Sequence, residues 1–325
     1  MSISRVSTYQ MNKSFASQIN STQSKFNKLA QQISSGKRVT SMTDDIVSAK
    51  SILKANKELE NIGLYQSNLK QADNELSQTD STLKSINDQL QKAYDVAMSV
   101  SNGTMGTEQL AAYQEELDAI IDNVTRLANT KYGDQYLFAG TATTTQPYSM
   151  VSTDDATVAN AGLVYAGNNG ARYAIVDEGK TQQINFTGSE LFGGASFTTD
   201  QTTGQITMDD ANSSGVFGAL YSLKAAIQDG DNIDTDKLKE SMGNIKTGME
   251  NVTAIQTKVG AMGSEMDDML ATYDTDALNV KELRSNLEDT DLPSAISDWY
   301  SVYQSLQASY SMMSQVANVS LLNYI

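Results

Sequence analysis

Residues 62–100 read IGLYQSNLKQADNELSQTDSTLKSINDQLQKAYDVAMSV and carry the longest unbroken helical pattern in the sequence. Apolar or small side chains recur in this stretch at steps of three and four residues, which places them on one face of a helix. A helix over residues 44–100 would be about 85 Å long at about 1.5 Å per residue, so it needs other helices alongside it. The residues on that face are Ile62, Tyr65, Leu69, Ala72, Leu76, Thr79, Leu83, Ile86, Leu90, Ala93, Ala97 and Val100.

Similar spacing predicts helices on both sides of this stretch. An earlier helix is expected to end at Gly36, because glycine suits the left-handed conformation that follows a helix. Only two prolines interrupt the chain, Pro147 and Pro293, and the second marks the start of a terminal helix. The remaining predicted helices cover about residues 6–34, 107–131, 216–227 and 238–287.

The turn before residue 46 contains a helix-start signal, Thr43-Asp44-Asp45. A side-chain oxygen of Thr43 or Asp44 can accept hydrogen bonds from the first free N–H groups of the following helix. Asp45 then suits the positive end of the helix dipole. We expect the cap to be Thr43 or Asp44.

Residues 140–215 lose the helical spacing and are rich in Gly, Thr, Ser and Asn. Short β-type runs occur there, separated by turn pairs such as Asn169-Gly170 and Glu178-Gly179. This composition predicts a small β-rich domain inserted between helical segments. The expected strands are at residues 163–165, 173–176, 183–186 and 205–208.

Together these patterns predict a mainly α fold with a β insertion. The helices from both chain ends are expected to form a long antiparallel coiled-coil bundle, and the insertion a small β-rich outer domain. The predicted domains are a terminal assembly domain (1–43 and 290–325), a helical rod (44–139 and 216–289) and the insertion (140–215).

The two chain ends carry matching apolar stripes with coiled-coil spacing, which we call the terminal seam. Such a stripe could be ordinary core within one molecule, but the pairing of both ends with each other and with further copies is the simpler interpretation. The partner-binding residues predicted on this basis are Phe15, Ile19, Phe26, Leu29, Ile33, Leu292, Ile296, Trp299, Tyr303, Leu306, Tyr310, Met313 and Leu321.

The chain ends also differ in charge from the middle. Residues 1–43 contain six basic and no acidic side chains, and residues 299–325 contain no charged side chain. The whole chain has a formal charge of −16, so the body between the ends is strongly acidic. We therefore expect it to bind neither nucleic acid nor an anionic membrane. No apolar run approaches the roughly 20 residues that span a bilayer.

Residue types exclude several chemistries. The sequence has no Cys and no His, so disulfides, thiolate nucleophiles, Cys/His metal sites and Ser-His-Asp triads are impossible. Residues 229–236 (DGDNIDTD) suggest a Ca²⁺ loop, but the EF-hand spacing fails. A turn with Asp234 or Thr235 as helix cap is the better interpretation. We expect no catalytic residue, no cofactor and no metal.

Several motifs resemble the flagellin superfamily. Near the start, QISSGKRV at residues 32–39 is followed by TDD at 43–45, and KYGDQYLFAGT at 131–141 resembles that family's turn into its outer domain. TKVGA at 257–261 and LEDTD at 287–291 resemble its C-terminal half. Within the superfamily, RVST at 5–8, the 136–141 stretch and the closing LLNYI are more similar to hook–filament junction subunits than to filament subunits.

The resemblance implies a structural subunit of the bacterial flagellum that lies outside the cell. It implies assembly with copies of itself and with neighbouring hook-associated and flagellin layers. It further implies export through the flagellar type III apparatus without a cleaved signal peptide, with a cytosolic chaperone on the C-terminal segment. The basic N-terminus could alternatively be a mitochondrial transit peptide, but the family motif continues directly through it.

The sequence therefore favours a non-enzymatic adaptor at the hook–filament junction that assembles by helical polymerisation. We expect residues 1–40 and 290–325 to be largely disordered in the monomer and to fold on assembly. Two alternatives remain open: the filament flagellin itself, and a secreted adhesin or binding module that acts through the β insertion.

Overall fold

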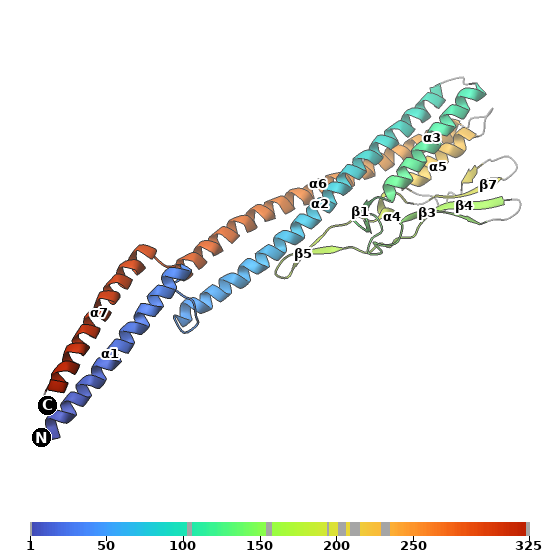
Figure 1. Ribbon diagram of the computed structural model, residues 1–325. Helices are drawn as coiled ribbons and strands as arrows, with labels where there is room; N and C mark the ends of the chain where they lie inside the picture. Colours follow the sequence, from blue (N-terminus) through green and yellow to red (C-terminus); the bar gives the residue numbers. More distant parts are fainter. Residues whose placement is uncertain are drawn as a thin grey trace. The chain divides into compact units, whose positions relative to one another are not determined.

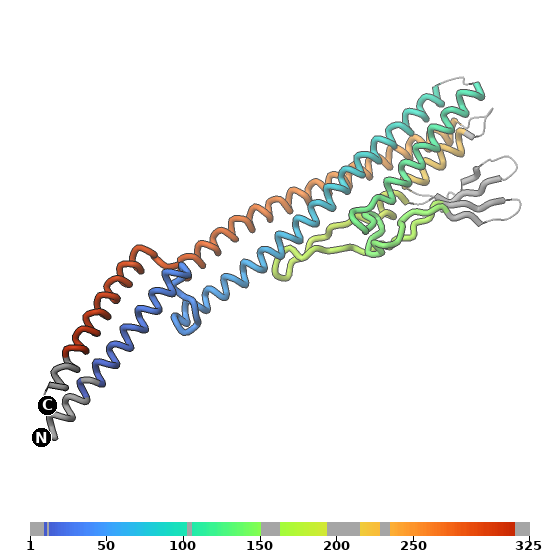
Figure 2. The backbone as a smooth tube through the Cα atoms, in the orientation of Figure 1, coloured from blue at the N-terminus to red at the C-terminus, as the bar shows by residue number. Residues whose placement is uncertain are grey.

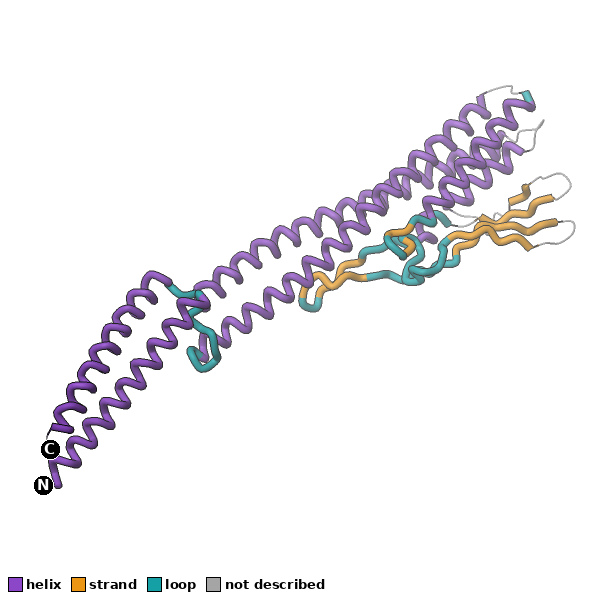
Figure 3. Tube along the Cα trace, in the orientation of Figure 1, coloured by secondary structure: helices purple, strands orange, loops and turns teal. Residues whose placement is uncertain are grey.

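The computed structural model describes residues 2–102, 106–153, 158–193, 195–200, 206–208, 215–228 and 235–322. Helices make up most of this chain, and the strands fall in one segment between α3 and α5 (Figures 1 and 3). The predicted mainly α fold with a small β insertion is confirmed. The helices are α1 (Ser2–Ser35), α2 (Ile46–Asn102), α3 (Thr107–Ala128), α4 (Gly188–Leu191), α5 (Gly215–Gln228), α6 (Thr235–Glu288) and α7 (Leu292–Leu322).

The chain divides into two compact units, with boundaries inside α2 and α6. The first unit contains residues 1–63 and 274–325, and the second contains residues 64–273. Each unit is described separately below.

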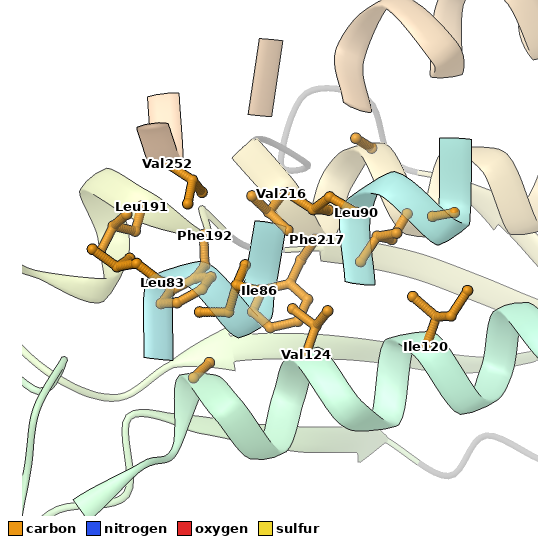
Figure 4. Packing of buried hydrophobic residues seen from close by; sticks show 14 of the residues in the cluster. Leu83, Ile86, Leu90, Ile120, Val124, Leu191, Phe192, Val216, Phe217 and Val252 are labelled. Carbon is orange, nitrogen blue, oxygen red and sulfur yellow. The ribbon is translucent and has the colours of Figure 1, made fainter. Parts of the chain in front are cut away.

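In the second unit, α2 and α6 run in opposite directions beside each other. The ring of Tyr65 lies 5.7 Å from that of Tyr273, and Leu90 lies next to Gly248. Helices α3 and α5 pack against each other and, with α2 and α6, enclose the main hydrophobic core (Figure 4). All the residues of the quoted 62–100 pattern are buried except Tyr65, which is half-buried.

Between α3 and α5, the residues that the structure describes form three small antiparallel sheets. One pairs β1 (Lys131–Tyr132) with β2 (Gln135–Tyr136), and another pairs β5 (Tyr173–Asp177) with β6 (Lys180–Gln183). The largest has the strand order β3-β4-β7-β8. Its strands are β3 (Tyr148–Thr153), β4 (Val158–Tyr165), β7 (Ala195–Asp200) and β8 (Ile206–Met208).

One predicted strand, at residues 183–186, is wrong apart from Gln183. Gly179 has a φ of +76° and makes the tight turn after β5, so the partner strand begins at Lys180 and ends at Gln183. Asn185 then lies in a loop, where its side-chain oxygen accepts a hydrogen bond from the backbone N–H of Arg172 at 2.7 Å. The turn at Gly179 therefore sets which residues of β5 and β6 pair with each other.

The insertion is fastened to the helices by polar contacts from several elements. Arg172 forms an ion pair with the buried carboxylate of Glu75 on α2 and donates to Gln135 at 3.0 Å. The side chain of Asn68 donates to the carbonyl of Ile175 at 2.8 Å. These bonds hold the β5–β6 hairpin against the α2 helix.

The loop after β2 explains the AGT motif at residues 139–141. Gly140 has a φ of +68°, and a Cβ atom there would lie 2.0 Å from the carbonyl oxygen of Asn168. The side chain of Asn168 accepts from the backbone N–H of Thr141 at 2.8 Å. Only glycine fits this close approach of two backbone segments.

Candidate assembly interface

In the first unit, α1 packs along α7, and the two helices lie side by side (Figure 2). The centre of their contact is aromatic. The ring of Phe26 lies 5.1 Å from that of Trp299 and 6.1 Å from that of Tyr303. Trp299 and Tyr303 are stacked at 5.8 Å with an interplanar angle of 7°. Ile19 and Leu306 are buried in the same unit, each 7% exposed.

The predicted terminal seam residues are only partly covered by this pairing. On α1 the stripe faces its partner, since Ile19 is buried and Phe15, Phe26, Leu29 and Ile33 are half-buried. Among the predicted seam residues of α7 whose side chains the structure describes, Leu306 is buried, Trp299 is half-buried and the others are exposed. The side chain of Leu321 lies outside those that the structure describes. The exposed members, 39–50% accessible, are Leu292, Ile296, Tyr303, Tyr310 and Met313.

The covered line on α7 is shifted around the helix from the predicted stripe. Ala295 and Leu306 are buried, and Trp299 and Val302 are half-buried, at steps of four, three and four residues. A single partner helix covers only a narrow line of a wide apolar stripe. The remaining flank of α7 is therefore left to solvent in the single chain.

Tyr300 belongs to this exposed flank, and the sequence pattern missed it. Its side chain is 58% exposed, and its ring makes an edge contact with Trp299 at 5.3 Å. The predicted stripe takes Trp299 as its member between Ile296 and Tyr303, although Tyr300 also fits this interval, at steps of four and three residues. A signal was nevertheless present, since three tyrosines and no charged residue occur between residues 299 and 310.

Residues 36–45, which we call the connecting loop, join α1 to α2 and also close the end of α6. Gly36 adopts a φ of +70° just after α1, as the sequence predicts. The backbone N–H of Arg38 donates to the carbonyl of Glu288 at 2.6 Å, and its guanidinium donates to the carbonyl of Leu287 at 2.7 Å. Carbonyl groups left free at the end of α6 thus obtain donors from the connecting loop.

The cap of α2 is Asp45, so the predicted caps, Thr43 and Asp44, are wrong. The Asp45 carboxylate accepts from the backbone N–H groups of Val47 and Ser48, both at 3.1 Å. Asp44 turns back instead and accepts from the N–H groups of Thr40 and Ser41 within the loop. Because the Asp44 carboxylate is used by the N–H groups of Thr40 and Ser41, the next residue, Asp45, caps the helix.

Both carboxylates are stabilised in their charged form. The pKa of Asp45 is lowered to about 2, first by the hydroxyl and backbone N–H of Ser48 and further by the guanidinium of Arg38. The pKa of Asp44 is also lowered to about 2, first by the ammonium of Lys28, 3.0 Å away, and then by Thr40. The connecting loop is therefore held by charge-assisted hydrogen bonds.

The described residues contain no cluster of acidic side chains that could hold a metal ion. Most of the suggested Ca²⁺ loop, residues 229–234, lies outside the described part of the chain. Within that part, no helix combines the length and apolar character that crossing a bilayer requires.

This arrangement defines a class of protein: a mainly helical chain whose two ends pair and leave an apolar flank of α7 exposed in the single chain. Two family models match the chain. "Bacterial flagellin N-terminal helical region" covers residues 6–143, and "Bacterial flagellin C-terminal helical region" covers residues 242–325. Together they span more than half of the chain, which therefore belongs to the flagellin family.

Two curated relatives match nearly end to end. The chain is 27% identical to flagellar hook-associated protein 3 of Salmonella typhimurium and 25% identical to that of Escherichia coli K12, with 98% of each chain covered in both cases. The flagellin of Salmonella montevideo is 26% identical, but the match covers 76% of this chain and 55% of the flagellin.

Solved structures share the fold. A putative flagellar hook-associated protein from Vibrio parahaemolyticus superposes with a TM-score of 0.61 at 22% identity, covering 76% of this chain and all of the other. FlgL of Bacillus cereus superposes with a TM-score of 0.54 at 21% identity, covering 71% and 99%. The family models and the two nearly full-length relatives make the protein a structural component of the bacterial flagellum and not an enzyme, as the sequence predicts.

Proposed function

We propose that this protein joins the flagellar hook to the filament as a structural adaptor. The observation that carries the proposal is the nearly complete match in length to hook-associated protein 3, against about half of a flagellin's length. Filament flagellin is the less favoured alternative for this reason. The adhesin hypothesis has no specific observation in its favour.

Assembly is proposed to proceed through the terminal seam, with α1 and α7 of one copy packing against those of neighbours. The exposed flank of α7 supports this, because monomeric proteins rarely leave a contiguous apolar surface of this kind uncovered. A pair of isolated helices is also marginal in water. Residues 1–40 and 290–325 would therefore become fully ordered only when further copies cover this flank.

The proposed division of labour follows the three predicted domains. Residues 1–43 and 290–325 form the assembly layer, residues 44–139 and 216–289 the rod, and residues 140–215 an outer domain. Neighbouring hook-associated and flagellin layers are the proposed partners, together with copies of the same chain.

Before export, the C-terminal segment is proposed to need a binding partner inside the cell. The uncharged and apolar C-terminal segment has to be kept from aggregating in the cell, so a cytosolic chaperone is the proposed partner of α7 before export. Export is proposed to use the flagellar type III apparatus without cleavage of a signal peptide. The final location is then outside the cell.

Electron microscopy of cells that lack the gene tests the junction role. Hooks without filaments are expected, and the wild-type gene should restore filaments. Cells that keep full-length filaments would refute the adaptor. Purified protein that grows into long filaments, rather than stopping at short assemblies, would favour the flagellin alternative.

A further inference from the structure

The α1/α7 pair has two chemically different sides. On one side, a groove of about 340 Å³ runs between the helices. Lys25, Lys28 and Gln32 line it from α1, and Asp298 and Ser301 line it from α7. Leu29 and Val302 complete the lining, so this side combines apolar surface with charges of both signs.

The other side of α7 is an aromatic and apolar ridge formed by Ile296, Tyr300 and Tyr303, which are 42%, 58% and 39% exposed. Positions two apart on a helix point about 200° away from each other, so Asp298 and Tyr300 lie on opposite sides of α7. The groove and the ridge can therefore be occupied at the same time.

The groove has charges that remain available. Among the described residues, Lys25 and Asp298 form no ion pair, whereas Lys28 is paired with Asp44 at 3.0 Å. An ammonium group binds the face of a tyrosine ring, and a carboxylate accepts a hydrogen bond from a tyrosine hydroxyl. This protein already uses the first contact elsewhere, with Lys131 lying 4.5 Å from the ring centre of Tyr136.

The ridge suits such a groove. It contains no charged residue, so it can be removed from water without leaving an ion unpaired. Tyrosine presents an apolar body and a polar tip, and for this reason it is common at interfaces. The groove supplies the ammonium group of Lys25 for the tyrosine ring and the carboxylate of Asp298 for its hydroxyl group.

We propose that the Tyr300 ridge of one copy docks into the Lys25–Asp298 groove of a second copy of this chain. The inference rests on the proposed function and specifies which faces meet. Because the two faces differ, the contact is heterologous, and each added copy presents a new free ridge and a new free groove. A symmetric pairing of ridge with ridge would stop at a dimer.

Cross-linking tests the geometry, because the natural chain has no cysteine and every engineered thiol is unique. One full-length variant carries Gln32→Cys in the groove, and the other carries Ile296→Cys on the ridge beside Tyr300. Each is oxidised alone and in an equimolar mixture under conditions in which sedimentation shows assembly. A disulfide-linked dimer is expected in the mixture and not with either variant alone.

The outcomes separate the two proposals. Assembly without the mixed disulfide, or a disulfide formed by Ile296→Cys alone, would overturn the docking inference and leave the adaptor role intact. Failure of the unmodified chain to assemble at any concentration would refute the assembly mechanism, and the docking inference would fall with it.

A double-mutant cycle supplies the energetic test. Lys25→Met should raise the protein concentration needed for assembly by roughly threefold to tenfold, the size of one cation–π contact. In a Tyr300→Leu background the same change should have no further effect, because the contact is already absent. Lys13→Met, an exposed lysine on α1 outside the groove, is the matched control. Additive effects, or an equal effect of the control, would contradict the contact.

Discussion

The aromatic centre of the α1/α7 pair allows a direct test, because Trp299 is the only tryptophan in the chain. Its ring lies 5.1 Å from that of Phe26, so its fluorescence reports whether the two helices are paired. Phe26→Ala removes this ring and its second contact, with Tyr303 at 6.1 Å.

The expected loss follows from the contacts. Each aromatic pair contributes about 0.5–1.5 kcal/mol beyond its buried area, and removing a half-buried ring costs roughly a further 1 kcal/mol of transfer free energy. A total of about 2 kcal/mol corresponds to roughly a 30-fold change in an equilibrium constant. If pairing is coupled to assembly, the concentration required for assembly rises by that factor.

The assay follows the tryptophan emission and the sedimented fraction together over a range of protein concentrations. The wild-type emission should shift to shorter wavelength as the protein assembles, and in Phe26→Ala the midpoint should lie about 30-fold higher. Phe186→Ala, a ring packed against the core of the second unit, is the control and should leave the midpoint unchanged. Equal midpoints for wild type and Phe26→Ala would refute the reasoning.

Three further predictions concern stability. Arg172→Met leaves the carboxylate of Glu75 buried without its cation and should cost about 3 kcal/mol in urea unfolding, whereas adding Glu75→Met should restore stability to within about 1 kcal/mol of wild type. Gly140→Ala should lower the free energy of unfolding by at least about 2 kcal/mol, because its backbone is left-handed and a Cβ atom has no room. The pKa values of the Asp44 and Asp45 carboxyl groups are both lowered to about 2, from about 3.8 in the unfolded chain. The charged carboxylates therefore stabilise the folded state fully above about pH 3.8, and this contribution is lost as the pH falls through about 2. Amide exchange at the start of α2, corrected for its intrinsic rate, should therefore accelerate below about pH 4 and stay constant from about pH 5 to 8; a change confined to neutral pH would contradict this assignment.

Long helices were predictable because burial is periodic along them. Leu69, Leu83 and Leu90 are fully buried, and each occupies the position that three-and-four spacing assigns to the core. The packing of several helices around α2 makes this pattern continuous, so local sequence reports tertiary structure faithfully.

The insertion was less predictable because its order depends on distant partners. The position of Arg172 is set by Glu75 and Gln135, and neither contact can be recognised from the residues next to Arg172 in the sequence. Strands β3 and β7 were missed for a similar reason, since they are set by pairing with β4 rather than by apolar alternation.

The candidate assembly interface was more predictable than the insertion and less predictable than the long helices. The residue spacing identified the apolar stripe of α7, but it could not predict which part of that stripe α1 covers. Ala295 and Leu306 are buried and Ile296 and Tyr303 are exposed, although all four belong to one broad face. That division depends on the crossing of two helices, which is a property of three-dimensional packing.

The connecting loop has a consequence for protein engineering. Arg38 supplies donors to the last carbonyls of α6, while Asp45 closes the start of α2, so ten residues serve the ends of two helices at once. A chimaera that exchanges the terminal arms at Gly36 would separate Lys28 and Gln32 of α1 from their partners in the loop, the carboxylate of Asp44 and the carbonyl of Arg38. Grafts should instead be cut within α2 and α6, beyond Ser48 and before Arg284, so that the loop travels together with both of the helix ends it serves.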